Sequence, residues 1–132
     1  MFTTILSSGP FLVAPTAKSV DWVIVNDSAH PQAVRVTVYK CAAGQPKVAL
    51  APGAVTETLA PGTTFHNANG VPNVFVPGFY YEVVVECNSV DVLPAVNQWS
   101  DHAAVEFIPA TLIPAGSFAK LTAQKMERSA TA

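Results

Sequence analysis

Residues 21–41 read DWVIVNDSAHPQAVRVTVYKC, in which two runs rich in Val flank a polar break. Every second residue from 34 to 38 is Val, which is the period of a strand with one buried face. The break favours an Asx-type turn, although Asn26-Asp27-Ser28 also matches an N-glycosylation acceptor. The stretch predicts two neighbouring strands whose second faces carry little charge.

Similar runs continue along the chain, separated by many of its eleven prolines and seven glycines. This pattern is typical of an all-β protein, and we predict a single β-sandwich of jelly-roll or immunoglobulin-like kind with roughly eight to ten strands. The strands are expected at Phe11–Ala14, Val20–Asn26, Ala33–Cys41, Lys47–Leu50, Ala54–Leu59, Thr63–Asn67, Tyr80–Cys87, Val90–Trp99, Ala104–Ile108 and Ser117–Leu121.

Proline and glycine place some of the turns. Ala51-Pro52-Gly53 and Ala60-Pro61-Gly62 predict type II turns, because proline fixes the first central φ and glycine accepts the positive φ of the second. Pro94 lies inside the run VDVLPAVNQW and cannot donate to a ladder, so this strand should lie at a sheet edge or carry a bulge.

The composition limits the classes of function. Only 12% of the 132 residues are charged and the net charge is −2, so no basic surface for nucleic acid is expected. The longest apolar runs are about five residues, far below the ~20 that span a membrane. Few charges and much apolar surface favour a domain that covers its outer faces with copies of itself or a partner.

The first residues are interpreted as an N-terminal arm (1–14), followed by the sandwich domain (15–121) and a C-terminal tail (122–132). Such an arm can add a strand to a neighbouring copy, burying Ile5, Leu6, Phe11, Leu12 and Val13. Alternatively, residues 11–14 form the first strand of the chain's own sheet and residues 1–8 are frayed. No basic residue precedes the apolar start, and Ser7–Pro10 interrupts it, so we expect no secretory signal.

Candidate reactive residues are few. Cys41 and Cys87 each end a strand, and either form a disulfide across the sandwich or stay reduced in the core. The three histidines, His30, His66 and His102, are dispersed and lack carboxylates at ligand spacing, so we predict neither a metal nor another cofactor. Ser100-Asp101-His102 is interpreted as a polar turn, because catalytic triads assemble from distant segments. We therefore expect a protein that is not an enzyme.

Aromatic residues offer the alternative function, a module that binds a carbohydrate or another small molecule. Trp99, at a strand end, would provide the contact surface together with Tyr80 and Tyr81. Trp22 shares a strand face with Val20 and Ile24 and is assigned to the core.

The segment IVNDSAHPQAVRVTVY resembles the small bacterial β-sandwich proteins grouped with the sensory rhodopsin transducer, and short proteins of spore-forming bacteria. In this frame a strand ends at Asn26 and the next begins at Val34. TLAPGTTFHNANGV and YEVVVECNSVDVLPAVNQWSD are similar to later parts of that group, so the likeness covers residues 20–101. Residues 62–70 lack the basic residues of that group, which places any role of a positive surface in doubt.

The resemblance implies a β-sandwich that assembles as an oligomer. A weaker similarity, in the arm and the low charge, is to β-sandwich subunits of bacterial surface and spore filaments. We therefore expect a structural protein that assembles with itself through sheet edges and the N-terminal strand. A cell-surface, spore-surface or extracellular location is favoured over the cytoplasm.

Overall fold

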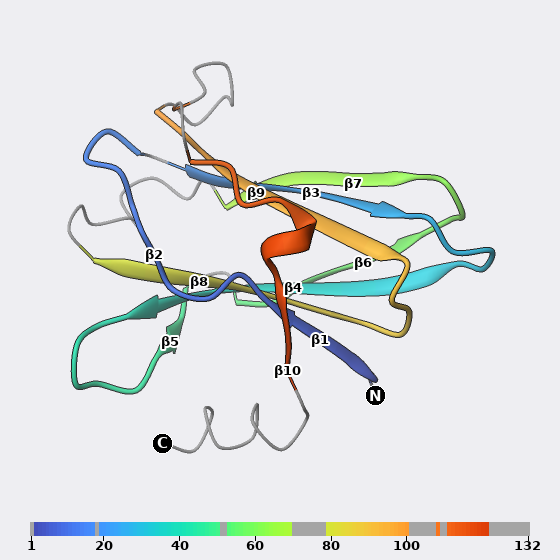
Figure 1. Ribbon diagram of the computed structural model, residues 1–132, viewed down its shortest axis with the longest axis horizontal. Coiled ribbons are helices and arrows are strands. Elements are labelled where there is room, and N and C mark those ends of the chain that lie inside the picture. The colour runs from blue at the N-terminus through green and yellow to red at the C-terminus, as the bar shows by residue number, and fades with distance from the viewer. Residues whose placement is uncertain are drawn as a thin grey trace.

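The computed structural model describes residues 2–17, 19–50, 53–69, 79–100, 108 and 111–121, and the side chains of residues 19 and 66–69 are outside this description. These residues form two antiparallel sheets that lie face to face, as Figure 1 shows. The predicted all-β sandwich is therefore confirmed, with ten strands and one short 3₁₀ helix among the described residues. The predicted strand at 104–108 and the tail at 122–132 lie outside them, apart from Ile108.

The larger sheet, here sheet A, has seven strands in the order β10-β1-β8-β4-β5, with β2 beside β8 and β6 beside β4. Its strands are β1 (Thr4–Ser7), β2 (Phe11–Leu12), β4 (Gln32–Cys41), β5 (Val48–Ala49), β6 (Val55–Leu59), β8 (Tyr80–Cys87) and β10 (Ala119–Leu121).

The smaller sheet, sheet B, has the order β7-β3-β9, with strands β3 (Ser19–Asn26), β7 (Thr64–Asn69) and β9 (Val92–Trp99). Pro94 lies on β9, an edge strand, as its missing N–H requires. Beyond β9, Ile113 exchanges backbone hydrogen bonds with Val96, and the 3₁₀ helix η1 (Ala115–Ser117) follows.

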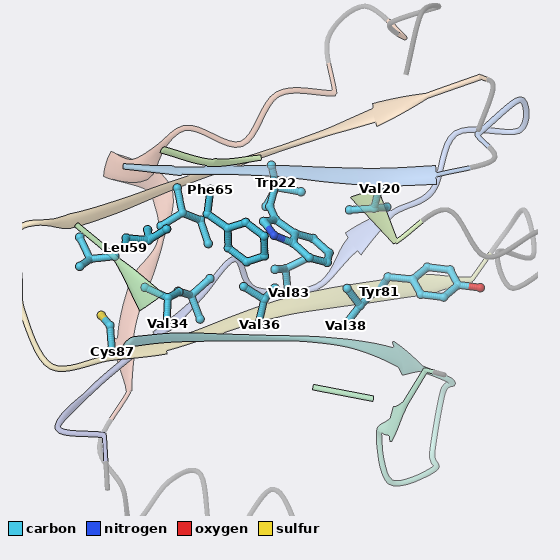
Figure 2. Packing of buried hydrophobic residues seen from close by; sticks show 14 of the residues in the cluster. Val20, Trp22, Val34, Val36, Val38, Leu59, Phe65, Tyr81, Val83 and Cys87 are labelled. Atoms are coloured by element: carbon cyan, nitrogen blue, oxygen red, sulfur yellow. The ribbon is translucent and has the colours of Figure 1, made fainter. Parts of the chain in front are cut away.

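The core lies between the sheets (Figure 2). The alternating valines of β4 meet Trp22 of β3, and the Trp22 and Phe65 rings pack edge to face at 6.1 Å. Trp22 is 1% exposed, so its assignment to the core is confirmed. Burying such side chains stabilises the fold by about 1.5–3 kcal/mol each for residues of Val or Ile size, which makes this layer the main source of stability.

The N-terminal segment differs from the arm expected from sequence. β1 lies inside sheet A, paired with β8 on one side and β10 on the other, and Ile5 is 6% exposed. β2 pairs with the same strand β8, and Val13 is buried in the core. Ile5 and Val13 are therefore buried within this chain's own fold, Leu6 and Phe11 pack against its core, and Leu12 stays 52% exposed, because β8 presents an edge long enough for both pieces.

A bulge joins these two pieces. The pairing of β1 with β8 and that of β2 with β8 differ by one residue in register, and residues 8–10 absorb the offset. Gly9 takes φ +69°, which side-chain-bearing residues rarely adopt. The Ser8 hydroxyl accepts a hydrogen bond from Val83 N, so the break in the ladder is bridged by a side chain.

The polar break between β3 and β4 is an Asx turn, as predicted. Asn26 is fully buried, and its Oδ1 accepts hydrogen bonds from the backbone N and the hydroxyl of Ser28. Its Nδ2 donates to the carbonyl oxygens of His30 and Leu59, both at 2.9 Å. The Ala60–Thr63 turn beside it has Gly62 at φ +75°, which confirms the predicted type II geometry.

Candidate functional site

The outward side of sheet A, here the sheet A face, carries paired charges. The guanidinium of Arg35 on β4 donates two hydrogen bonds to the carboxylate of Glu86 on β8, at 2.9 and 2.7 Å. Lys47 donates to Glu82 at 2.9 Å, and the Ser7 hydroxyl donates to the other oxygen of that carboxylate. Because Arg35 and Glu86 are Cα partners, the strand register itself brings this pair together.

Apolar and small residues also point outward on this side of sheet A. Val84, opposite Thr37 in the register, is 0% exposed although it faces away from the core. The Lys47 ammonium lies 4.6 Å from the centre of the Tyr39 ring, and burial raises the pKa of the Tyr39 hydroxyl. The hydrogen bond with Glu86 raises the pKa of Arg35. The centre of the sheet A face therefore carries neutralised ion pairs, of which the Arg35 side chain is the most exposed member.

The outward side of sheet B is different. Here the sheet B face means six residues: Val23, Val25, Leu93, Ala95, Leu112 and Pro114. Val25 pairs with Leu93 and Val23 with Ala95, which puts four of them on the outward side of β3 and β9. Leu112 and Pro114 flank Ile113, which packs on the core, so they point outward beside β9. Leu112 is 54%, Leu93 42% and Val23 36% exposed.

Charge is distributed unequally between the two sheets. All four basic residues of the described chain, Arg35, Lys40, Lys47 and Lys120, belong to sheet A or to the loop between β4 and β5. Among Asp, Glu, Lys and Arg, the strands of sheet B hold only Asp21, which is fully buried. The exposed part of the sheet B face is therefore uncharged and apolar.

The aromatic residues predicted to form a ligand surface do not come together. Tyr81 is 0% exposed and belongs to the core, because it alternates in phase with Val83 and Val85, so its assignment to a surface was wrong. Tyr80 points outward from sheet A and is 49% exposed. Trp99 is half-buried on sheet B, where its Nε1 donates to Asn97 Oδ1 at 2.8 Å.

The cysteines do not form a disulfide in this fold. Cys41 is the Cα partner of Tyr80, and Cys87 lies seven residues beyond Tyr80 on β8. At about 3.4 Å per residue the Cα atoms of the two cysteines are roughly 24 Å apart, whereas a bridge needs Cα atoms within about 7 Å. Both cysteines are free, and burial raises the pKa of each thiol.

A hollow of about 380 Å³ lies at the β4–β5 end of sheet A. The described residues of its wall are Lys40, Ala42, Gln45, Pro46 and Val48. The ammonium of Lys40 lies 4.2 Å from the centre of the Phe79 ring. The wall is mostly apolar, with a single cation at its edge.

Metal-ligating side chains do not cluster in the described part of the chain, where no three His, Cys, Asp or Glu residues gather. His30 is exposed in the loop before β4, while the side chain of His66 and all of residues 101 and 102 lie outside the described residues. Within the same ranges no helix is long and apolar enough to cross a membrane.

These features define the chain as an all-β sandwich whose sheet A carries ion pairs on its outer side, while the six described residues of the sheet B face are uncharged. No protein-family model and no curated protein matches its sequence. The solved structure of Thermotoga maritima 1070 is similar, with a TM-score of 0.52 and 12% identity over 92% of each chain. This likeness concerns the fold alone.

The Anabaena sensory rhodopsin transducer is also similar, with a TM-score of 0.44 and 18% identity over 74% of this chain and 82% of the transducer. It belongs to the group that the sequence resembles, although a likeness at this TM-score carries no argument about function. The resemblance to proteins of spore-forming bacteria stays a prediction.

The sheet B face could have been found in part from the sequence. In β3, Val23 and Val25 are out of phase with Trp22 and Ile24, so both faces of the strand are apolar. Leu112 gave no such signal, because its orientation depends on one backbone bridge between Ile113 and a strand far away in sequence.

Proposed function

We propose that this protein is a non-enzymatic β-sandwich subunit that associates with itself, and that the sheet B face is the contact surface. The main observation in its favour is that this face is uncharged, apolar and partly exposed, while the basic residues of the described chain all belong to sheet A or its β4–β5 loop. The oligomer implied by the family resemblance supports the same proposal. The arm exchange expected from sequence is not part of it, because β1 and β2 complete the chain's own sheet.

The area of the sheet B face determines how strongly two copies are expected to associate. Three neighbouring segments spaced by about 4.8 Å, each about five residues long, cover about 245 Å² per copy and about 490 Å² for two. At ~25 cal/mol per Å², burying this area contributes at most about 12 kcal/mol, against an association cost of about 4–15 kcal/mol. The area is below the ~1,200 Å² of standard interfaces, so we expect association in the micromolar range rather than an obligate complex.

The polar groups of the sheet A face support a role without catalysis. Ser7, Glu82 and Lys47 are linked by hydrogen bonds, but Ser7 is 3% exposed and its hydroxyl also accepts from Gly9 N. A nucleophile must reach its substrate, and this hydroxyl is covered. The hydrogen-bonded network therefore has a structural role, in which Lys47 neutralises the charge of Glu82.

The test is the solution mass of the full chain across roughly 10–500 µM, by sedimentation or light scattering. We expect the mass to rise above that of one copy, and Leu93→Glu to return it to one copy, because two carboxylates would be buried without partners. Thr56→Glu is the matched control: Thr56 is exposed and faces outward from sheet A, so association should be unchanged. A wild-type protein that stays a single copy throughout would refute the proposal.

A second candidate function is binding of a small organic anion in the hollow at the β4–β5 end. Its apolar wall would take the body of the ligand, and the Lys40 ammonium its charge. A fluorescent aryl sulfonate is a suitable probe. Binding that Lys40→Met abolishes and Leu93→Glu leaves intact would support it, whereas equal binding to all three proteins would contradict it.

A further inference from the structure

We infer that the association closes at a two-fold dimer with the sheet A faces outward, and does not continue into a filament. This rests on the proposed self-association through the sheet B face. An open filament needs two different adhesive surfaces on each subunit, whereas a surface that pairs with its own copy is used up in a dimer. Among the described residues, the sheet B face lies over the middle of its sheet, whereas the middle of sheet A carries ion pairs and the exposed Leu12, Val48 and Tyr80 lie at its end near Cys41.

The sheet A face is unsuited to being the second surface. Its centre carries the Arg35–Glu86 and Lys47–Glu82 pairs, and Val84, between Glu82 and Glu86 on β8, is fully buried. Packing another copy over this centre would take the Arg35 side chain, which is 42% exposed, out of water, and desolvation of such a pair opposes binding. Association is therefore more favourable when the sheet B face of one copy packs on the sheet B face of another.

Two of the long sheet edges also oppose continued growth. On β6, Glu57 is opposite Val34 in the register, so an exposed carboxylate sits on the core side of an edge strand. Inward-pointing charge of this kind discourages pairing with another edge. On β9, backbone groups are already taken by Ile113, and the Ile108 amide donates to the Gln98 carbonyl at 3.0 Å.

Two-fold symmetry makes a specific geometric prediction. In such a dimer, residues near the axis meet the same residue of the other copy, while in a head-to-tail assembly they meet a different one. Val23 and Ala95 are Cα partners at the middle of the sheet B face. They should therefore lie near the axis, and their counterparts in the partner copy should be close.

Cross-linking through a single introduced cysteine tests this in the full chain. The background is Cys41→Ser, and Cys87 is kept because it is 0% exposed. With a short bis-maleimide, Val23→Cys should yield a covalent dimer at concentrations where association is measured. Thr56→Cys, on the sheet A face, should stay a single copy.

The mass of the unmodified chain is measured in parallel and should level off at two copies as concentration rises. Ala95→Cys serves as a second central position, should Val23→Cys alter the thermal unfolding of the protein. A mass that grows beyond two copies, or Thr56→Cys cross-linking as readily as the central positions, would overturn the closed dimer alone. A chain that is a single copy at every concentration would overturn the proposed self-association as well.

Discussion

Replacing Asn26 with Ala should be among the most damaging single changes outside the apolar core. Its side chain makes four hydrogen bonds, two as donor to the carbonyls of His30 and Leu59 and two as acceptor from Ser28. They connect the loop after β3 with the end of β6. Asn26 is fully buried, so water reaches few of the groups that would lose their partner.

The cost follows from these contacts. A hydrogen bond contributes about 1 kcal/mol net, and a buried group left without a partner costs about 1–3 kcal/mol. Ser28 and His30 lie in an accessible loop and recover part of their bonds from water, whereas the bond to the Leu59 carbonyl is buried. We expect Asn26→Ala to lower the free energy of unfolding by about 3–4 kcal/mol, a large share of the ~5–15 kcal/mol of a typical domain.

The assay is urea unfolding followed by Trp fluorescence. With a slope of about 2 kcal/mol per molar, the midpoint should fall by roughly 1.5–2 M. Asn88→Ala is the matched control, because the Asn88 Oδ1 also accepts two hydrogen bonds, from the N and hydroxyl of Thr3, but at an exposed site. The control should lose at most about 1 kcal/mol. An equal loss in both variants would show that burial of the Asn26 amide is not what fixes this loop.

Three further outcomes follow from the fold. Gly9→Ala should cost about 1 kcal/mol through its positive φ alone, since no atom lies within 4 Å of the added Cβ, while Gly116→Ala should cost less; equal unfolding midpoints would contradict this. The unfolded protein should show two reactive thiols without reductant, and the folded protein should react at Cys41 before the buried Cys87; a single mass shift on reduction would refute free thiols. The pKa of the Cys87 thiol is raised above its ordinary 9.0, so the thiol loses its proton at a lower pH in the unfolded chain than in the folded one. The free energy of unfolding should therefore fall as pH rises above about 9, and Cys87→Ala should make this fall less steep. An unchanged slope in Cys87→Ala would contradict this prediction.

The strands with strong local signals were predictable. β4 and β8 alternate clearly, and turn residues bound β6 and β7, so their positions agree with the sequence to within one or two residues. β1 was not predicted as a strand of its own sheet. Its residues Ile5 and Leu6 are covered on opposite sides of the sheet, and this depends on β8 and β10, which are remote in the sequence.

The candidate surfaces were only partly predictable for a related reason. In the sequence many outward strand positions are apolar, which predicts that these positions are covered. On sheet A, the outward-facing Val84 is buried, and the strand register brings Arg35 and Glu86 together as an ion pair. On sheet B, Val23 and Leu93 stay exposed. Distinguishing these cases requires the pairing of β4 with β8, which no local pattern specifies.

The interior position of β1 also affects how the chain is made. β1, the first of the described strands to be synthesised, has no neighbour until β8, around residue 85, and β10, around residue 120, have been synthesised. Sheet A therefore cannot be completed before residue 121 has been added, and β1 must wait in an unfinished chain until then. Slow elongation should thus expose this segment to chaperones and proteases for longer, without helping it to fold.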